Sequence, residues 1–300
     1  MIQIFEVGVR DGLQNESRKF NFDDKIFLAQ GLIDAGIRDL ELGAFVRPDK
    51  VPQMADTEAL YQAVRVKKLR AKGANLWALV PNLKGLERAI ASQVSHIAVF
   101  TAATESFAKK NIGMSIGESL ATFKEVIQEA KRNKIQVRGY VSTAFACPFE
   151  GKTPAKKAIQ VVSQLMKLGV TQVSVGDTIG RATPKDIDLV FKPLLKKFSA
   201  KKLAGHFHDT RGTALANALR ALELGIKTLD ASAGGLGGCP FAPGATGNLA
   251  TEDLVYMLNG LGEKTGIDLK KLAQTSLAFS QKLQRPLSSR YLAAFQANGS

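Results

Sequence analysis

Short β-rich runs alternate with longer helical patterns along the whole chain, and this alternation limits the possible folds more than any other feature. It predicts βαβ units built on a parallel sheet. Glycine follows the predicted helices at Gly36, Gly169 and Gly225, each a few residues before the next predicted strand, as expected of a helix C-cap. Eight strands are predicted, over residues 3–7, 39–42, 75–79, 96–101, 136–141, 172–175, 202–206 and 228–231. Helices are predicted over residues 23–35, 56–68, 83–91, 119–133, 155–168, 184–198, 214–224 and 252–265.

Eight such units in a chain of 300 residues predict an α/β fold, the TIM (β/α)8 barrel. A doubly wound sheet is the alternative, but its first strand should lead into a phosphate-binding glycine fingerprint, and residues 8–12 lack that spacing. No linker or low-complexity tract divides the chain. We therefore expect one domain over residues 1–300, with the barrel over about 1–266 and a C-terminal helical extension over about 267–300.

Composition limits the classes of function. Lys plus Arg at 41 against Asp plus Glu at 27 gives a net charge of +14, which favours an anionic partner or is simply a solvated basic surface. The lysines form scattered pairs without a recognition motif, so we expect no nucleic acid partner. No apolar run approaches a membrane span, and the first residues do not resemble a signal peptide. Two cysteines are too few for a disulfide framework, and we predict a cytoplasmic protein.

A pair of histidines gives the most specific local signal. In a TIM barrel the catalytic groups come from the C-terminal ends of the strands. His206 and His208 lie two apart at the end of the seventh predicted strand, so both imidazoles face one side and favour a shared metal. Asp11, after the first strand, is the best carboxylate ligand, and Asn248, after the eighth, is the best amide. This mixed N/O set suits Mg²⁺, Mn²⁺ or another divalent ion better than a structural zinc.

Other polar residues are expected at the same end of the barrel. Arg10 either forms an ion pair with a distant partner or stabilises a developing oxyanion. Glu41 and Asp177 end or follow strands, and they either support the arginine and the metal or are surface acids. Tyr140 and Ser142 lie at the end of the fifth strand. His96, the third histidine, begins a strand at the opposite end of the barrel and is expected to be structural.

The segment 234–248 is too rich in glycine and proline for a helix or an ordinary strand, so it predicts a loop. It carries Cys239 between Gly-Gly and Pro. This cysteine is a candidate acid and, less favoured, a soft metal ligand. A loop of this kind can close over a metal and keep water away from a reactive intermediate.

Several motifs together resemble the 3-hydroxy-3-methylglutaryl-CoA lyase family, within the metal-dependent lyase TIM-barrel superfamily. The resemblance covers nearly the whole chain, and its motifs occur in order. They are Arg10-Asp11-Gly12-Leu13-Gln14-Asn15-Glu16, Val51-Pro52-Gln53-Met54, Arg138-Gly139-Tyr140-Val141-Ser142, Gly176-Asp177-Thr178-Ile179-Gly180, His206-Phe207-His208-Asp209-Thr210 and Gly235-Leu236-Gly237-Gly238-Cys239-Pro240 through Leu254.

The resemblance implies a carbon–carbon lyase that splits a 3-hydroxy-3-alkyl acyl-CoA into acetyl-CoA and a 3-keto acid. It implies that a divalent metal, Mg²⁺ or Mn²⁺, is bound by Asp11, His206, His208 and Asn248. Further implied roles are catalytic. They are enolate stabilisation by Arg10, proton donation by Cys239, support or proton handling by Asp177 and Glu41, and relay of the hydroxyl proton by Asp11 or His206. We further expect substrate contacts from Arg10, Gln14, Tyr140, Ser142, Thr178 and Asn111, with CoA phosphates beside Lys109 and Lys110.

The chain departs from the family pattern at a few positions. Gly43 and Ala44 stand where small hydroxyl residues are usual, Ser17 replaces a common Lys, and Phe241 replaces a frequent Tyr. The exact acyl group therefore stays open, as do leucine degradation, ketone-body formation and isoprenoid degradation as pathways. Alternatives are a TIM-barrel aldolase or Claisen-type synthase and, outside enzymes, a basic anion- or nucleic-acid-binding protein. A homodimer is expected.

Overall fold

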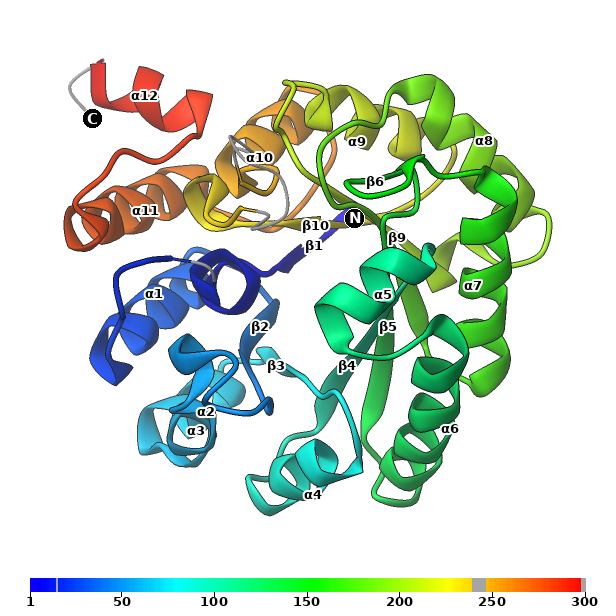
Figure 1. Cartoon of the computed structure of the whole chain (residues 1–300). Coiled ribbons are helices and arrows are strands. Elements are labelled where there is room, and N and C mark those ends of the chain that lie inside the picture. Colours follow the sequence, from blue (N-terminus) through cyan, green and yellow to red (C-terminus); the bar gives the residue numbers. More distant parts are fainter. Residues whose placement is uncertain (15, 239–246, 298–300) are drawn as a thin grey trace.

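The computed structural model describes residues 1–14, 16–238 and 247–297. Eight parallel strands close into a barrel, and helices surround them (Figure 1). Around the barrel the order is β1, β10, β9, β8, β5, β4, β3 and β2, so the first and last strands pair side by side. The predicted TIM-barrel fold is confirmed.

All eight predicted strands are present, and their ends differ from the prediction by two residues or fewer. In chain order they are β1 (Gln3–Glu6), β2 (Asp39–Ala44), β3 (Asn75–Leu79), β4 (His96–Ala102), β5 (Gln136–Ser142), β8 (Gln172–Asp177), β9 (Leu203–Phe207) and β10 (Thr228–Ala231). A small antiparallel hairpin, β6 (Ala146–Cys147) with β7 (Gly151–Lys152), lies in the loop after β5. The hairpin was not predicted, because two-residue strands are too short to produce an alternating pattern.

The α-helices of the described residues are α1 (Phe22–Asp34), α2 (Thr57–Gln62), α3 (Val64–Ala71), α4 (Leu83–Ala91), α5 (Glu105–Ile112), α6 (Ile116–Arg132), α7 (Ala155–Leu168), α8 (Pro184–Leu195), α9 (Ala214–Glu223), α10 (Thr251–Gly260), α11 (Leu269–Leu283) and α12 (Arg290–Ala297). The single helix predicted over 56–68 is wrong: Ala63 is extended and separates α2 from α3. Helix α5 was not predicted, whereas α11 and α12 confirm the predicted C-terminal helical extension. Gly36, Gly169 and Gly225 all have positive φ, which confirms the predicted stops. No helix in the described ranges combines the length and the apolar character that a membrane crossing requires.

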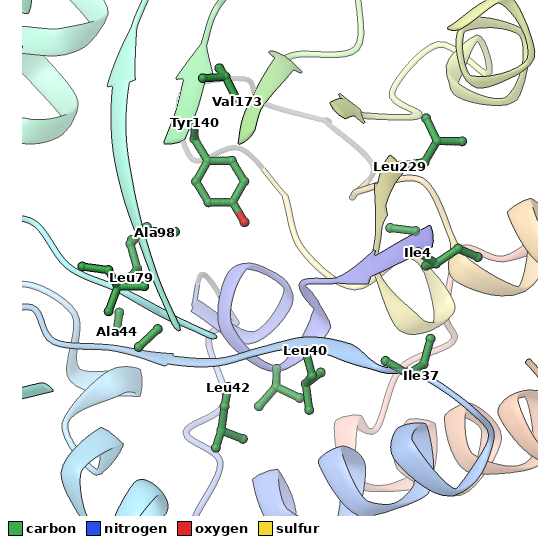
Figure 2. Close-up of a cluster of buried hydrophobic side chains, with 14 of the residues drawn as sticks. Ile4, Ile37, Leu40, Leu42, Ala44, Leu79, Ala98, Tyr140, Val173 and Leu229 are labelled. Atoms are coloured by element: carbon green, nitrogen blue, oxygen red, sulfur yellow. The ribbon is translucent and has the colours of Figure 1, made fainter. Parts of the chain in front are cut away.

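Strand alternation separates an apolar outer layer from a polar interior. Figure 2 shows Leu40 and Leu42 on the outer side of β2, facing the helices, whereas Tyr140 of β5 projects to the inside. Glu41 lies between the two leucines in β2 and is fully buried, so its side chain occupies the opposite, inner face. The main hydrophobic core therefore lies between strands and helices, and buried polar groups share the inside of the barrel with the aromatic rings of Phe5 and Trp77.

The C-terminal helices pack on the first and the last helix of the barrel, α1 and α10 (Figure 1). Helix α11 packs on α1 and α10, and α12 packs on α10. One buried carboxylate fixes the start of α12. Asp253 Oδ1 accepts hydrogen bonds from Ser289 Oγ at 2.6 Å and from the Tyr291 amide at 2.8 Å, and its Oδ2 accepts from the Arg290 amide at 3.1 Å.

We predict that Asp253→Ala loosens α12, because three donors lose their acceptor at once. The free energy of unfolding should fall by about 1–3 kcal/mol, the cost of leaving buried donors unpaired. Urea denaturation measures this loss, and amide hydrogen exchange at Arg290 and Tyr291 should become faster. Glu125→Ala, on the exposed face of α6, is the control and should change neither quantity. Unchanged exchange in Asp253→Ala would contradict the assigned anchor.

Candidate metal centre and active site

A cavity of about 830 Å³ opens at the end of the barrel where the strands terminate. Most of the side chains predicted for the site lie on its wall. These are Arg10, Asp11, Gln14, Asn111, Tyr140, Ser142, Thr178, His206 and His208. Glu41, Asp177 and Asn248 lie behind this wall. The candidate acid, Cys239, falls outside the described residues, as does Phe241.

Three of the predicted ligands converge. One ligand atom from each of Asp11, His206 and His208 lies within 4.8 Å of the other two. The two histidines come from the end of β9, as their spacing predicted. Asn248 joins the group, since its Nδ2 donates to Asp11 Oδ2 at 2.9 Å and its backbone forms a bridge with His208.

Two buried polar atoms beside the group have no hydrogen-bond partner among the described residues. They are Asn248 Oδ1 and His208 Nδ1. Buried polar atoms are rarely left unpaired in folded proteins. A cation held by the two imidazoles, the carboxylate and the amide oxygen would give such groups a partner. The donor set of this site therefore fits a divalent metal ion.

The protonation states of the ligands also suit a metal. Burial and the neighbouring His206 lower the pKa of His208 to about 4, so this imidazole is neutral at pH 7. Burial works against the charge of Asp11, but Arg10, His206 and His208 lower its pKa to about 2. Metal ligands must be deprotonated to bind, and both groups meet that requirement at neutral pH.

His206 has a carboxylate partner that the sequence did not reveal. Asp230 Oδ2 lies 3.2 Å from His206 Nδ1, and the same carboxylate accepts from Arg138 and Ser174. Burial lowers the pKa of His206, yet the hydrogen bond and the charge of Asp230 raise it overall. The sequence feature that could have revealed this partner is an acidic residue, Asp230, inside the buried strand β10.

Arg10 forms ion pairs with its neighbour Asp11 and with Glu41 of β2. Residues 8–12 form a single π-helical turn, with the Gly8 amide bound to Glu6, and this turn directs both Arg10 and Asp11 to the cavity. Arg10 Nη1 donates to Asp11 Oδ1 at 2.8 Å, and its Nε donates to Glu41 Oε2 at 2.7 Å. Arg10 therefore has the distant ion-pair partner that one alternative expected, in Glu41, and also pairs with the adjacent Asp11.

Glu41 supports the arginine from inside the barrel. It is fully buried, and its Oε2 also accepts from the Tyr140 hydroxyl at 3.3 Å. Burial raises the pKa of Glu41, although the charge of Arg10 opposes the rise. Tyr140 in turn accepts from Arg138 Nη1 at 3.2 Å.

Asp177 has a different environment from the one expected. Its two oxygens accept from the backbone amides of Arg181 at 3.0 Å and Ala182 at 2.9 Å, so the carboxylate shapes the loop after β8. Burial raises its pKa to about 6 despite these bonds. Asp177 lies off the cavity wall, and its reach to the site is electrostatic, through His206.

Other expected contacts are also placed differently. Besides Arg10, the lysines and arginines on the cavity wall are Arg47, Lys50, Lys84 and Arg88, whereas Lys109 and Lys110 do not line it. The ammonium group of Lys110 lies 3.9 Å from the centre of the Phe149 ring. Gly43 and Ala44 are also off the wall, and a side chain at Gly43 would collide with Thr57.

Comparison with known proteins identifies the family. The family model described as HMGL-like matches residues 1–278, which is most of the chain. The chain belongs to the HMGL-like family. Members similar to it include hydroxymethylglutaryl-CoA lyase YngG of Bacillus subtilis, 42% identical over 99% of this chain and 98% of that protein. The mouse protein named 3-hydroxy-3-methylglutaryl-CoA lyase, cytoplasmic, is 46% identical over 91% of this chain and 78% of its own length. Other similar relatives carry mitochondrial names.

Solved structures agree with this membership. The crystal structure of the B. subtilis HMG-CoA lyase has a TM-score of 0.94 and covers 98% of both chains. An HMG-CoA lyase from Acinetobacter baumannii, described as a complex with coenzyme A and 3-methylmalate, has a TM-score of 0.92. It is 37% identical and covers 98% of this chain and 95% of that one.

The HMGL-like motif at residues 51–54 has a structural role here. Gln53 is buried, its Oε1 accepts from the Phe20 amide at 2.9 Å, and its Nε2 donates to the Arg18 carbonyl at 2.8 Å. Lys25, also buried, donates to the Gln53 carbonyl and to Asp56. The motif therefore ties the chain after the Arg10–Asp11 turn to the loop after β2.

Buried glutamates hold the start of the glycine-rich segment. Glu6 Oε1 accepts from the Ala233 amide at 3.0 Å, and Glu252 Oε2 accepts from the Gly234 amide at 2.7 Å. Ser276 of α11 donates to the other oxygen of Glu252. Burial raises the pKa of Glu6 to about 7 and that of Glu252 to about 8. A Gln side chain at position 252 can satisfy both partners, because the serine hydroxyl can accept as well as donate.

We predict that Glu252→Gln removes a pH-dependent loss of stability. The folded state holds the Glu252 proton more tightly than the unfolded chain, so its stabilising contribution is complete below pH 4.5 and disappears as the pH rises to about 8. The variant should match the parent at pH 4.5 and exceed it at pH 8.5 by a few kcal/mol in free energy of unfolding. Denaturant titrations at both pH values measure the difference. Glu125→Gln is the exposed control, and parallel profiles for the parent and Glu252→Gln would refute the assignment.

Proposed function

We propose that this HMGL-like protein is a metal-dependent lyase that cleaves 3-hydroxy-3-methylglutaryl-CoA, or a related 3-hydroxy-3-alkylglutaryl-CoA. The products are acetyl-CoA and acetoacetate, or the matching 3-keto acid. The observation that carries the proposal is the convergence of Asp11, His206 and His208 beside Arg10 in one cavity. Similar relatives named as hydroxymethylglutaryl-CoA lyases support the reaction, and the related structure with coenzyme A supports an acyl-CoA substrate.

The metal is proposed to be Mg²⁺ or Mn²⁺, held by Asp11, His206, His208 and Asn248 Oδ1. When bound, such an ion supplies the positive charge that makes the tertiary hydroxyl of the substrate easier to deprotonate. The unpartnered oxygen of Asn248 and the neutral state of His208 support this ligand set.

The protein's own groups would complete the reaction. The hydroxyl proton passes to Asp11 or His206, the carbon–carbon bond breaks, and its electron pair moves to the thioester part as an enolate. Arg10 stabilises that enolate with a guanidinium that two carboxylates hold in place. Cys239 gives a proton to the enolate carbon, which releases acetyl-CoA. Glu41 keeps Arg10 in position, and Asp177 shapes the loop that carries Thr178.

The cavity wall offers separate places for the two parts of the substrate. Gln14, Tyr140, Ser142, Thr178 and Asn111 line the same cavity as Asp11, His206 and His208, which supports them as substrate contacts. The phosphates of CoA are proposed to meet Lys50 and Lys84, which have no ion-pair partner among the described residues. A homodimer and a cytoplasmic location remain predictions, and sedimentation velocity tests the first.

We expect purified protein with Mg²⁺ or Mn²⁺ to release acetyl-CoA from 3-hydroxy-3-methylglutaryl-CoA. A coupled assay of acetyl-CoA measures the reaction, and a panel of longer 3-hydroxy-3-alkylglutaryl-CoA esters determines the preferred acyl group. Chelation should abolish turnover, and added metal should restore it. No product from any ester of the panel in the presence of metal would reject the proposed function.

We predict that Arg10→Lys spares metal binding but lowers kcat by about 100- to 1000-fold, the usual effect of losing one oxyanion donor. His208→Ala should instead lower metal affinity and activity together. Comparing the two variants therefore separates stabilisation of the enolate from metal binding. Arg47→Lys, on the cavity wall and paired with Asp49, is the matched control and should retain turnover. Steady-state kinetics and Mn²⁺ titration measure these effects, and full turnover in Arg10→Lys would exclude its role.

A further inference from the structure

We propose that Asp230, fixed by Arg138, is the positioning residue that determines which ring nitrogen of His206 faces the metal position. The inference rests on the proposed function, because it concerns a ligand of the proposed metal. None of the motifs that resemble the lyase family contains Asp230, and it does not lie on the cavity wall. It acts from inside the barrel, on the side of His206 that faces away from the cavity.

The hydrogen-bond geometry leaves one arrangement for the imidazole. Asp230 Oδ2 lies 3.2 Å from His206 Nδ1. The same carboxylate receives Ser174 Oγ at 2.6 Å and Arg138 Nη2 at 2.5 Å. An ionised carboxylate can only accept, so Nδ1 must carry the hydrogen. In the neutral ring, Nε2 of His206 then keeps its lone pair free, as a metal ligand needs.

Asp230 itself has little freedom to move. It is fully buried, and so is Arg138, whose guanidinium lies 3.8 Å from the centre of the Phe5 ring. Arg138 Nε also donates to Gln172 Oε1 at 3.1 Å. The two oxygens of Asp230 accept from Arg138 and from Ser174, so neighbouring donors hold both sides of the carboxylate. Because the carboxylate of Asp230 is fixed in this way, its hydrogen bond also fixes the orientation of the His206 ring.

The two imidazoles are therefore not equivalent. Among the described residues, His206 has a carboxylate partner at Nδ1, whereas the Nδ1 of His208 has no hydrogen-bond partner. This difference provides an internal reference, because a change that acts through Asp230 should reach His206 and leave the ring of His208 in its original state.

The same ion pair connects the two sides of the site. Arg138 donates to the Tyr140 hydroxyl, which donates to Glu41, and Glu41 binds Arg10. Since Arg10 binds Asp11, hydrogen bonds link the ligand His206 to the ligand Asp11 through the barrel interior. Displacement of Asp230 would therefore disturb the spacing of both ligands.

The test uses Asp230→Asn, which preserves the size of the side chain and removes its charge. Mn²⁺ affinity of the metal-free protein is measured by calorimetry, and ¹⁵N NMR reports the ring tautomers, which is practical because the chain has only three histidines. We expect a 10- to 100-fold weaker Kd, as for other groups that orient metal ligands. We also expect His206 to lose its uniform Nδ1–H tautomer, while His208 keeps its own.

The matched control is Asp39→Asn. Asp39 is another buried carboxylate of the barrel, bound to Gln3, Asn75 and Trp77 and without a bond to any site residue among those described. The Asp39→Asn variant should keep the parental Kd for Mn²⁺ even if its melting temperature falls. An equal loss of affinity in both variants would overturn the proposal, as would an unchanged Kd with an unchanged His206 tautomer in Asp230→Asn.

A second variant covers the case in which Asp230→Asn does not fold. Ser174→Ala removes one donor to the oxygen that binds His206 and leaves the ion pair intact. It should weaken Mn²⁺ binding in the same direction and to a smaller extent, and parental values would overturn the inference. If the parent protein itself binds no Mn²⁺, the proposed function fails together with this inference. If the parent binds and the variants bind equally well, only the positioning role fails.

Discussion

Two ion pairs inside the barrel, Arg10 with Glu41 and Arg138 with Asp230, are the interactions on which the site depends. Charges in such a place are costly unless each finds a partner, and removing one member of a buried pair typically costs about 3–5 kcal/mol. Tyr140 joins the pairs by accepting from one and donating to the other. The interior of this barrel is therefore an ordered polar network, where many TIM barrels pack branched aliphatic side chains. The same network that stabilises the strands also orients the residues at their ends.

The sequence predicted the features that depend on local pattern. Alternation located the eight strands, glycine located the helix ends, and the spacing of His206 and His208 predicted their convergence. The sequence could not predict that Asp230 binds His206 and Arg138, because alternation assigns a side chain to a face of the sheet and not to a partner across the barrel. Arg138 and Asp230 are 92 positions apart. The direction of Arg10 was also open, since it depends on a π-helical turn that Glu6 stabilises through the Gly8 amide.

Burial explains a second group of residues that the sequence left unassigned. Glu6 and Glu252 look like ordinary acids in the sequence, yet both are fully enclosed and accept backbone amides at the start of the glycine-rich segment. Neighbouring Glu252 and Asp253 serve different partners, since one binds Ser276 of α11 and the other fixes the start of α12. The C-terminal helices are thus coupled to residues 233–235, where the chain enters the segment that carries Cys239. Only the packing of distant helices reveals this coupling.

The charge balance of the interior argues for a cation even though the chain as a whole is basic. In the network around the two ion pairs, Arg10 and Arg138 bring two positive charges, and Asp11, Glu41 and Asp230 bring three negative ones when ionised, an excess of one negative charge within this network. The net charge of +14 must therefore lie elsewhere, and part of it lies on the cavity wall. A divalent ion is drawn to the interior excess, and an anionic substrate is drawn to the basic wall. One cavity can thus attract ligands of opposite sign, because its polar interior and its outer wall carry opposite charge.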